Sequence, residues 1–285
     1  TAAMENATLL ARGGRIVAIG TSVRVPANAR RVDLSGKTVM PTMINAHAHL
    51  GYEGYTSWGA ANQTATNVLD HLQREAFYGT AAVQSVGSSP VDMSLAFRRD
   101  QQAGKFPPAA RYLFTPGYAP PNGGPDEILR EATSALHVIQ EVSTAAAARA
   151  SVDAMARKGI KAVKIWVDDR RGTYPKMTPE VYNAIIAEAH RRGMLVHAHA
   201  TTLADQKAVV RAGADVLVHL VQGEKIDAEL EMLLAQKKPY WATVIGLGDP
   251  VAVCQPDPFF EQALPPNVVT KIRANKERRA LTAHC

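Results

Sequence analysis

Short apolar runs alternate with longer segments of helical period between residues 41 and 245, and this alternation predicts a parallel α/β core. Strands that alternate with helices are typical of right-handed βαβ units, in which helices cover a parallel sheet. Seven runs are expected to form strands: 43–49, Thr80–Val86, Arg111–Thr115, Lys161–Val167, Met194–His199, Asp215–Leu220 and Tyr240–Ile245.

Three helices between these runs are marked by their apolar stripes and by their ends. The segment 179–192 has Thr178 at its N-cap and Gly193 directly after its last residue. An Ala-rich helix is expected near 144–158, and a Leu-rich helix is expected at 227–237.

The first 40 residues differ from this core. Two runs, Ala7–Ala11 and Arg15–Gly20, are predicted to form strands on either side of a turn with two glycines, and Arg31–Leu34 is predicted to form another short strand. We therefore expect residues 1–40 to form a small β module.

The other end of the chain leaves the core one strand short of a barrel. After the seventh run a Pro-rich segment leads into a basic helix at Val268–Thr282, and no further strand-like run follows. Eight parallel strands, each followed by a helix, close a TIM-type barrel of about 250 residues. The prediction is therefore an α/β protein with a (β/α)8 TIM-type barrel at 41–285 that lacks the eighth strand in this chain. The Pro/Gly-rich stretch Thr115–Pro125 is expected to be a long loop at the end of the third strand.

Composition and charge exclude several classes of function. The chain has 46% hydrophobic and 20% charged residues, as in ordinary globular proteins, and no apolar run of about 18 residues that would span a membrane. Its net charge of +6 comes from basic pairs scattered along the chain, which favours solvated helix faces over a nucleic-acid surface. We therefore expect a small-molecule substrate and neither nucleic acid nor a membrane as partner; a homo-oligomer stays open.

Cysteine use and the start of the chain bear on the compartment. The two cysteines, Cys254 and Cys285, provide neither a disulfide framework nor a Cys-based zinc motif. No charged-then-apolar leader is visible after Thr1, so the expected location is cytoplasmic, with a removed leader left open.

Histidines recur in the apolar runs in a pattern that favours a metal site. His47 and His49 are two residues apart, so in a strand both imidazoles point the same way and can hold a zinc-like ion. The fifth run repeats this spacing with His197 and His199, and the sixth run carries His219. A single core histidine is more often structural than a ligand, but this ordered set indicates a metal centre.

Lys164 is an amine inside an apolar strand, where an uncompensated ammonium is costly. One interpretation is that Lys164 extends its amine toward water or pairs with Asp168 or Asp169. The other is that carbon dioxide carbamylates the amine, which converts it into a carboxylate able to bridge two metal ions.

Four motifs stand in one order along the chain: 41–49, Val163–Ile165, Val196–His199 and Gly213–His219. In this order they resemble the amidohydrolase superfamily, and within it the branch with a binuclear metal centre and a carboxylated lysine, which includes prolidase-like and imidazolonepropionase-related hydrolases. The similarity extends over most of the chain, since Gly79–Gly87 resembles the second strand of that family. The N-terminal β module resembles the first part of the small β-sandwich that flanks such barrels.

The resemblance implies a set of metal ligands. His47 and His49 would hold the more buried ion, and Lys164, carboxylated by carbon dioxide, would bridge it to a second ion. That second ion would be held by His197 and His219. Zinc is the default for such ligands, and manganese, iron or cobalt also fit.

The resemblance also implies hydrolysis of a carbon–nitrogen bond, in an amide, a peptide-like compound or a cyclic amide, by a hydroxide that bridges the metals. His199 is the candidate catalytic residue beside the substrate, and Tyr118 is a further candidate for stabilising the oxyanion. Arg170 and Arg171 follow the fourth strand and either meet a substrate carboxylate or are ordinary surface arginines.

One departure from the family is clear. The expected aspartate at the end of an eighth strand, which would act as ligand and base, is absent from this sequence, and Asp249 and Asp257 lie in turn-forming Gly-Asp-Pro and Pro-Asp-Pro settings. Three alternatives therefore stay open: a lactonase or phosphotriesterase on the same scaffold, a non-hydrolytic decarboxylase or isomerase, and a catalytically defunct binding protein.

Overall fold

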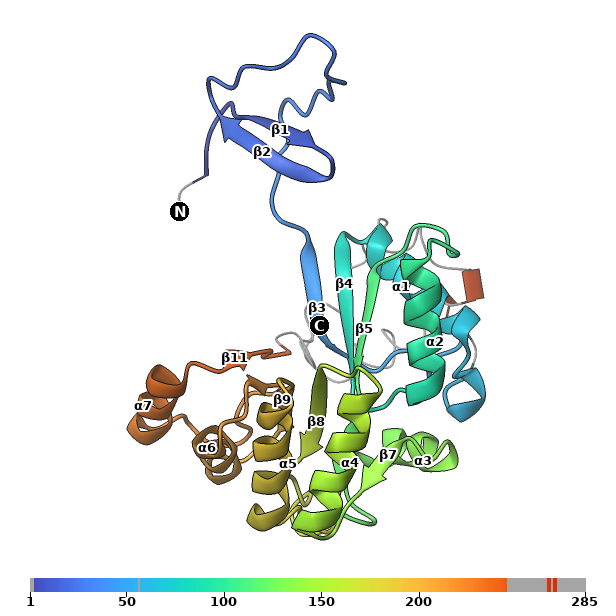
Figure 1. Ribbon diagram of the computed structural model, residues 1–285, viewed down its shortest axis with the longest axis vertical. Helices are drawn as coiled ribbons and strands as arrows, with labels where there is room; N and C mark the ends of the chain where they lie inside the picture. The colour runs from blue at the N-terminus through green and yellow to red at the C-terminus, as the bar shows by residue number, and fades with distance from the viewer. Residues whose placement is uncertain (1–2, 56, 245–265, 268, 271–285) are drawn as a thin grey trace. The chain divides into compact units, whose positions relative to one another are not determined.

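The computed structural model describes residues 3–55, 57–244, 266–267 and 269–270 (Figure 1). Several predicted features lie outside the described residues: both cysteines, Asp249, Asp257, the last residue of the seventh predicted strand, and the helix Val268–Thr282 apart from residues 269–270.

The chain divides into two compact units, Thr1–Pro41 and Thr42–Cys285. The first unit is built around an antiparallel hairpin of β1 (Thr8–Arg12) and β2 (Arg15–Gly20), joined by two glycines with positive φ, as the tight turns of hairpins require. The predicted third strand at Arg31–Leu34 is wrong, since these residues have no strand structure. Its apolar side chains are exposed, and a lone hairpin has no packed face that would order it. The β-sandwich assignment stays a prediction.

The second unit contains parallel strands at each of the seven predicted positions and two short strands that were not predicted. They form a three-stranded sheet in the order β3-β4-β5 and a six-stranded sheet in the order β11-β10-β9-β8-β6-β7. The strands are β3 (Met43–Ala48), β4 (Thr80–Val86), β5 (Arg111–Thr115), β6 (Gly117–Ala119), β7 (Ile139–Glu141), β8 (Ala162–Trp166), β9 (Leu195–His199), β10 (Val216–Leu217) and β11 (Tyr240–Trp241).

Helices separate most successive strands, and the three predicted helices are confirmed to within one residue at each end. None of the helices in the described part of the chain is long and apolar enough to cross a membrane. The helical elements are η1 (Ala60–Asn62), α1 (Ala65–Phe77), α2 (Val91–Gln102), α3 (Glu127–Ala135), α4 (Ala145–Arg157), α5 (Pro179–Arg191), α6 (Leu203–Ala212) and α7 (Ala228–Lys237).

The two sheets are joined at Pro116, which separates β5 from β6. Proline has no N–H for a sheet ladder, but its carbonyl accepts a hydrogen bond from the Lys164 backbone N at 2.8 Å. One extended segment therefore pairs with β4 through β5 and with β8 through β6. The expected long loop at Thr115–Pro125 is thus partly wrong, because Tyr118 and Ala119 are fully buried sheet residues. The resulting parallel α/β arrangement is compatible with a TIM-type barrel.

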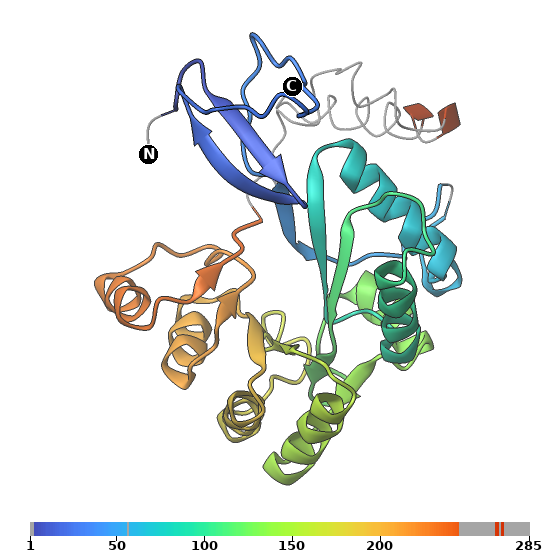
Figure 2. The ribbon, with the colours of Figure 1, turned by 45° about the horizontal axis from the view of Figure 1, so that its top comes forward.

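The main core lies between these strands and their helices. Alternate residues of β8 and β9, among them Val163, Ile165 and Val196, are fully buried and belong to one cluster with Val152 of α4 and Ile185 of α5. Helices α4 and α5 lie side by side, and Figure 2 shows the helices on the outer side of the strands. The other faces of β8 and β9 are thereby left for the polar residues of the candidate site.

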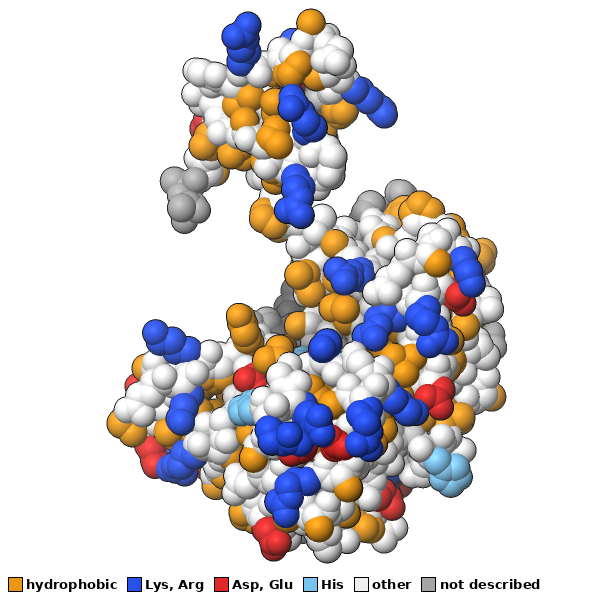
Figure 3. All heavy atoms as spheres, in the orientation of Figure 1, with side chains coloured by type: hydrophobic (Ala, Val, Ile, Leu, Met, Phe, Trp, Pro, Cys, Tyr) orange, Lys and Arg blue, Asp and Glu red, His pale blue; other side chains and the backbone are white. Residues whose placement is uncertain are grey.

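Basic side chains on the outer surface of α4 and α5 are paired with acidic ones (Figure 3). Arg157 and Arg192 contact Asp153, and Arg191 and Arg192 contact Glu188. These residues form a solvated ion-pair network, which is the ordinary role expected for the basic pair Arg191-Arg192.

Candidate metal centre

Four histidines from three separate parts of the second unit lie together. The ring centres of His47 on β3 and of His49, the first residue after β3, are 5.2 Å apart. The ring of His219, which follows β10, lies 4.8 Å from His47 and 4.4 Å from His199 on β9. Strand β10 ends two residues before His219, so strand alternation does not dictate the direction of its side chain.

Lys164 lies on the same face of the sheet as the β9 histidines. Parallel register pairs Lys164 with His197 and Trp166 with His199, and paired residues of parallel strands project their side chains to the same side. The side chain of Lys164 is fully buried, and burial, aided by the positive charge of Arg170, lowers its pKa to about 7.

The Lys164 amine has no hydrogen-bond partner among the described residues. The expected pairing with Asp168 or Asp169 is therefore wrong: Asp168 bonds to His199 and Arg170, and Asp169 pairs with Lys176. Nζ lies 5.0 Å from the centre of the Trp166 ring, a contact that stabilises a charge less than an ionic partner would. A neutral amine is thus the form that this environment favours.

Trp166 is a site residue that the sequence did not reveal. Its indole fits between Gly87 and Gly117, where an added Cβ would stand 2.4 Å from the ring in either case. Gly87, which directly follows β4, and Gly117, the first residue of β6, therefore make room for the aromatic ring that lies near Lys164. The sequence does show glycines at the end of one strand and the start of another, but their role could not be inferred without knowing which strands pair.

Three of the site histidines have ring nitrogens without a hydrogen-bond partner. Both ring nitrogens of His47 and Nδ1 of His197 and His219 are buried without a hydrogen-bond partner among the described residues. Burial, with a further contribution from Lys164, lowers the pKa of His197 to about 4, and burial lowers that of His219 to about 2. The pKa of His47 is lowered by the same causes. These imidazoles are neutral near pH 7 and keep a lone pair.

Two histidines are oriented by hydrogen bonds. Nδ1 of His49 lies 2.9 Å from the Ser88 hydroxyl, and burial lowers the pKa of His49 to about 3. The backbone carbonyl of His219 accepts hydrogen bonds from Nε2 of Gln206 at 3.0 Å and Nε1 of Trp241 at 2.7 Å. These contacts fix the segment after β10.

These observations test whether the site suits a metal ion. A buried polar atom without a partner costs about 1–3 kcal/mol, so four such residues in one place call for a ligand. Neutral imidazoles are ligands for zinc and similar ions. In the described residues no group of three or more His, Cys, Asp or Glu side chains is yet close enough to hold an ion. The donor atoms are therefore of the kinds that bind such a metal, and the rings lie near one another without forming a complete set of ligands around one position.

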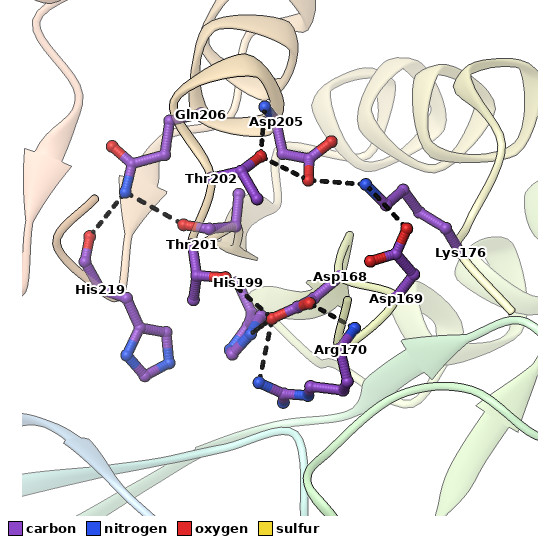
Figure 4. Close-up of polar contacts among 11 residues, drawn as sticks. Asp168, Asp169, Arg170, Lys176, His199, Thr201, Thr202, Asp205, Gln206 and His219 are labelled. Carbon is purple, nitrogen blue, oxygen red and sulfur yellow. Dashed lines mark hydrogen bonds and ion pairs between the residues drawn. The ribbon is translucent and has the colours of Figure 1, made fainter. Parts of the chain in front are cut away.

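His199 belongs to a separate polar network (Figure 4). Its Nε2 lies 2.8 Å from Oδ2 of Asp168, which also accepts from the Thr201 hydroxyl at 3.0 Å and from Nη1 of Arg170 at 2.9 Å. Burial alone raises the pKa of Asp168, but the bonds from His199 and Arg170 outweigh this effect and hold it below its usual range. Asp168 is thus an ionised carboxylate directly behind His199.

Tyr118 lies outside this group. Its hydroxyl contacts that of Ser151 in α4 at 3.3 Å, and burial raises its pKa to about 12. Tyr118 pairs in register with Ile165, on the face of the sheet opposite to Lys164. The expectation that Tyr118 stabilises an oxyanion is therefore wrong, because the residue packs between sheet and helix.

The fold and the site together define a parallel α/β protein with a candidate metal centre. No family model matches the sequence, and no curated protein shows significant similarity to it. Solved structures do match. A structure described as an amidohydrolase aligns over 96% of this chain and 69% of its own, with 20% identity and a TM-score of 0.68.

Two further structures show similar agreement. A prolidase complexed with N-methylphosphonate-L-proline aligns over 94% of this chain and 67% of its own, with 21% identity and a TM-score of 0.67. Phenylurea hydrolase B aligns over 82% of this chain and 60% of its own, with 20% identity and a TM-score of 0.67. At these identities the similarity is one of fold.

Proposed function

We propose that this chain belongs to a metal-dependent hydrolase of the amidohydrolase superfamily, which cleaves a carbon–nitrogen bond in an amide, peptide-like or cyclic amide small molecule. The observation that carries the proposal is the set of buried, unpartnered nitrogens on His47, Lys164, His197 and His219. The solved structures with this fold include an amidohydrolase, a prolidase and a phenylurea hydrolase, which favours hydrolysis of such bonds.

The proposed ligands fall into two groups. His47 and His49 would hold one divalent ion, and His197 and His219 would hold a second, most simply zinc in both places. When bound, two such ions lower the pKa of a water molecule toward neutrality and polarise the carbonyl group of the substrate.

Lys164 would join the two groups after carboxylation. Its neutral amine attacks carbon dioxide, a nitrogen–carbon bond forms, one proton is released, and the product is a carbamate with two oxygen ligands. Burial favours this step because it lowers the pKa of Lys164 to about 7, so that a large share of the amine is unprotonated near neutral pH. The carbamate also removes the cost of an unpartnered buried amine.

His199 would handle a proton. Because ionised Asp168 only accepts hydrogen bonds, Nε2 of His199 carries the ring proton and Nδ1 of the neutral ring keeps its lone pair. His199 in this form accepts a proton at Nδ1 and can donate to an oxyanion only after doing so. We therefore assign it proton transfer between water and the leaving nitrogen, with Asp168 as the residue that orients it.

A binding protein without catalysis is the second candidate. It is favoured by one observation, the lack of a closed group of three or more metal-binding side chains within the described residues. Metal analysis together with a hydrolysis assay distinguishes the two functions.

The test is the metal content of the protein, expressed with bicarbonate and measured by elemental analysis. We expect about two divalent ions per chain and hydrolysis of members of an amide library. Folded protein that takes up neither zinc nor manganese would contradict the hydrolase. Metal uptake without hydrolysis of any amide, ester or phosphotriester would favour the binding protein.

A further inference from the structure

We propose that Ser88, which lies just after β4, positions His49 as a metal ligand. The Ser88 hydroxyl oxygen accepts a hydrogen bond from Nδ1 of His49, and this leaves the lone pair of Nε2 free for the ion. The inference rests on the metal centre proposed above and assigns a positioning residue to it. Tyr52 acts on the same ring at one remove, because its hydroxyl holds the backbone of Ser88.

The first observation is that His49 differs from the other three histidines proposed as ligands. Its Nδ1 lies 2.9 Å from Oγ of Ser88. The Nδ1 atoms of His47, His197 and His219 are buried without a hydrogen-bond partner in the described part of the chain. Which nitrogen of a neutral imidazole carries the proton is set by the hydrogen bond that the ring makes. His49 is therefore the ligand whose tautomer the protein can select before an ion arrives.

The second observation is that strand pairing alone does not fix the direction of the His49 side chain. Asn45 of β3 pairs with Val83 of β4. The next pair joins Ala48 and Ser85, so three steps along β3 oppose two steps along β4. Such an extra residue interrupts the regular alternation of side chains along a strand. β3 then ends at Ala48, directly before His49. The ring therefore needs a contact outside the ladder to hold it in place.

The third observation is that this contact is one of three hydrogen bonds between the end of β4 and the residues after β3, strands that lie side by side (Figure 1). The backbone N of Leu50 donates to Oγ of Ser85 at 3.2 Å, and the Tyr52 hydroxyl donates to the carbonyl oxygen of Ser88. The side chains of Ser85, Ser88 and Tyr52 are fully buried, so bulk water does not compete for these bonds. Together they keep the Ser88 hydroxyl beside the His49 ring.

Metal binding selects one direction for the hydrogen bond between His49 and Ser88. A neutral imidazole carries its proton on one ring nitrogen, and only the other nitrogen can bind an ion. If Nδ1 donates to the Ser88 oxygen, Nε2 keeps its lone pair. If the hydroxyl donates to Nδ1 instead, Nε2 carries the proton and cannot be a ligand. Ser88 therefore has to act as the acceptor when His49 holds an ion through Nε2.

The adjacent serine provides a matched control. Ser89 is also buried, and its hydroxyl lies 2.8 Å from that of Ser85. Ser88 and Ser89 are therefore neighbouring buried hydroxyl groups of the same size, of which Ser88 contacts a proposed ligand and Ser89 contacts another serine. Removal of either hydroxyl leaves a buried partner atom unsatisfied, so the cost in stability should be similar. A purely structural Ser88 would then behave like Ser89 in every assay.

The test compares the full chain with its Ser88→Ala, Ser88→Thr, Ser89→Ala and Tyr52→Phe variants, with zinc as the probe. Zinc affinity is measured by competition with a chelator, and nitrogen NMR of the zinc-loaded protein identifies the tautomer of His49. We expect Ser88→Ala to weaken zinc binding by about 10–100-fold and Ser89→Ala to stay within about twofold. Ser88→Thr, which keeps the hydroxyl, should restore most of the affinity, and Tyr52→Phe should cause a smaller loss than Ser88→Ala. In the wild type the proton of His49 should be on Nδ1.

The comparison of the two serine variants decides the role of Ser88, and an amide hydrolysis assay decides the hydrolase. Equal zinc affinities of Ser88→Ala and Ser89→Ala, or a His49 protonated on Nε2 in the zinc-loaded protein, would overturn the positioning role even if amides are hydrolysed. Zinc binding that depends on Ser88 without any hydrolysis would support the role and contradict the hydrolase. A folded wild type that binds no zinc would contradict both. If Ser88→Ala unfolds, Tyr52→Phe against Ser89→Ala gives the same decision.

Discussion

The proposed metal ligands come from two kinds of strand. Lys164 and His197 lie on β8 and β9, each of which has a neighbour on both sides. His47 lies on β3 and His49 directly follows it, and β3 pairs only with β4 among the described residues. Side chains on the strand face away from the site differ strongly in burial: Ile165 of β8 is fully buried, and Ile44 of β3 is 66% exposed. On the site face burial does not differ in this way, because ring or amine nitrogens without hydrogen-bond partners are buried in both groups.

This contrast shows how the site is stabilised. The β8–β9 half is positioned by packing that exists without a ligand, since its helix-facing side chains belong to the main core. The β3 half has far less packing behind it, so its local stability in the metal-free protein should be lower. A metal ion that joins the two halves would therefore stabilise β3 more than β8 or β9.

The largest expected effect comes from replacing Lys164, the one charged residue on β8 and β9. We expect Lys164→Met to lose bound metal and to reduce kcat/KM by more than about 10³-fold, because the metals supply several kcal/mol of transition-state stabilisation. The same variant should be at least as stable as the wild type in its metal-free form, since an unpartnered buried amine is replaced by an apolar chain of similar length.

Elemental analysis, steady-state kinetics and urea unfolding measure these three quantities. Lys161→Met is the matched control, because Lys161 is exposed just before the same strand. Full metal content in Lys164→Met would exclude the bridging role.

A pair of isoleucine substitutions measures the contrast itself. Ile165→Ala should destabilise the protein by about 2–5 kcal/mol, because it opens a cavity in the core. Ile44→Ala should cost less than about 0.5 kcal/mol, as at other exposed positions. Urea unfolding of the metal-free protein gives both values. Equal costs would mean that β3 is covered as completely as β8.

The sequence predicted the elements well where local signals are strong. The helix at 179–191 was found because Thr178, Pro179 and Gly193 mark its ends, independent of tertiary contacts. β6 was missed because Pro116 and Gly117 are typical of a turn, and only the contact with β8 makes them part of a sheet. The predictions failed where distant strands decide the local structure.

The candidate site shows the same limit. His-x-His spacing could indicate that His47 and His49 point together, but it could not show that His219 would reach both His47 and His199. Nor could the sequence distinguish Arg170 from Arg171, since both have a positive φ and the difference arises from the contacts of Arg170 with Asp168. Residue types were predictable, and their convergence was not.

The last expected effect is a pH dependence of stability, to which the site residues of β3 and of β8–β9 contribute alike. In the metal-free protein, His197 has a pKa of about 4 against about 6.5 unfolded, and Lys164 has one of about 7 against about 10.5. Between each pair of values the unfolded chain binds more protons than the folded chain, so stability rises with pH. We expect one rise from pH 4 to 6.5 and another from pH 7 to 10.5, on the order of 3 kcal/mol for His197 and 5 kcal/mol for Lys164.

Urea unfolding across this range, with a chelator present, measures both rises. Lys164→Met should remove most of the alkaline rise and reduce the acid one only slightly, because burial, more than the charge of Lys164, lowers the pKa of the histidines. His47 on β3, whose pKa is also lowered by burial, should contribute to the acid rise together with His197. If His47→Gln left the acid rise unchanged while His197→Gln reduced it, the β3 side of the site would be open to water in the metal-free protein. The lower burial of β3 would then hold on its site face as well as on its other face. Metal binding would have to desolvate His47 as well as order β3.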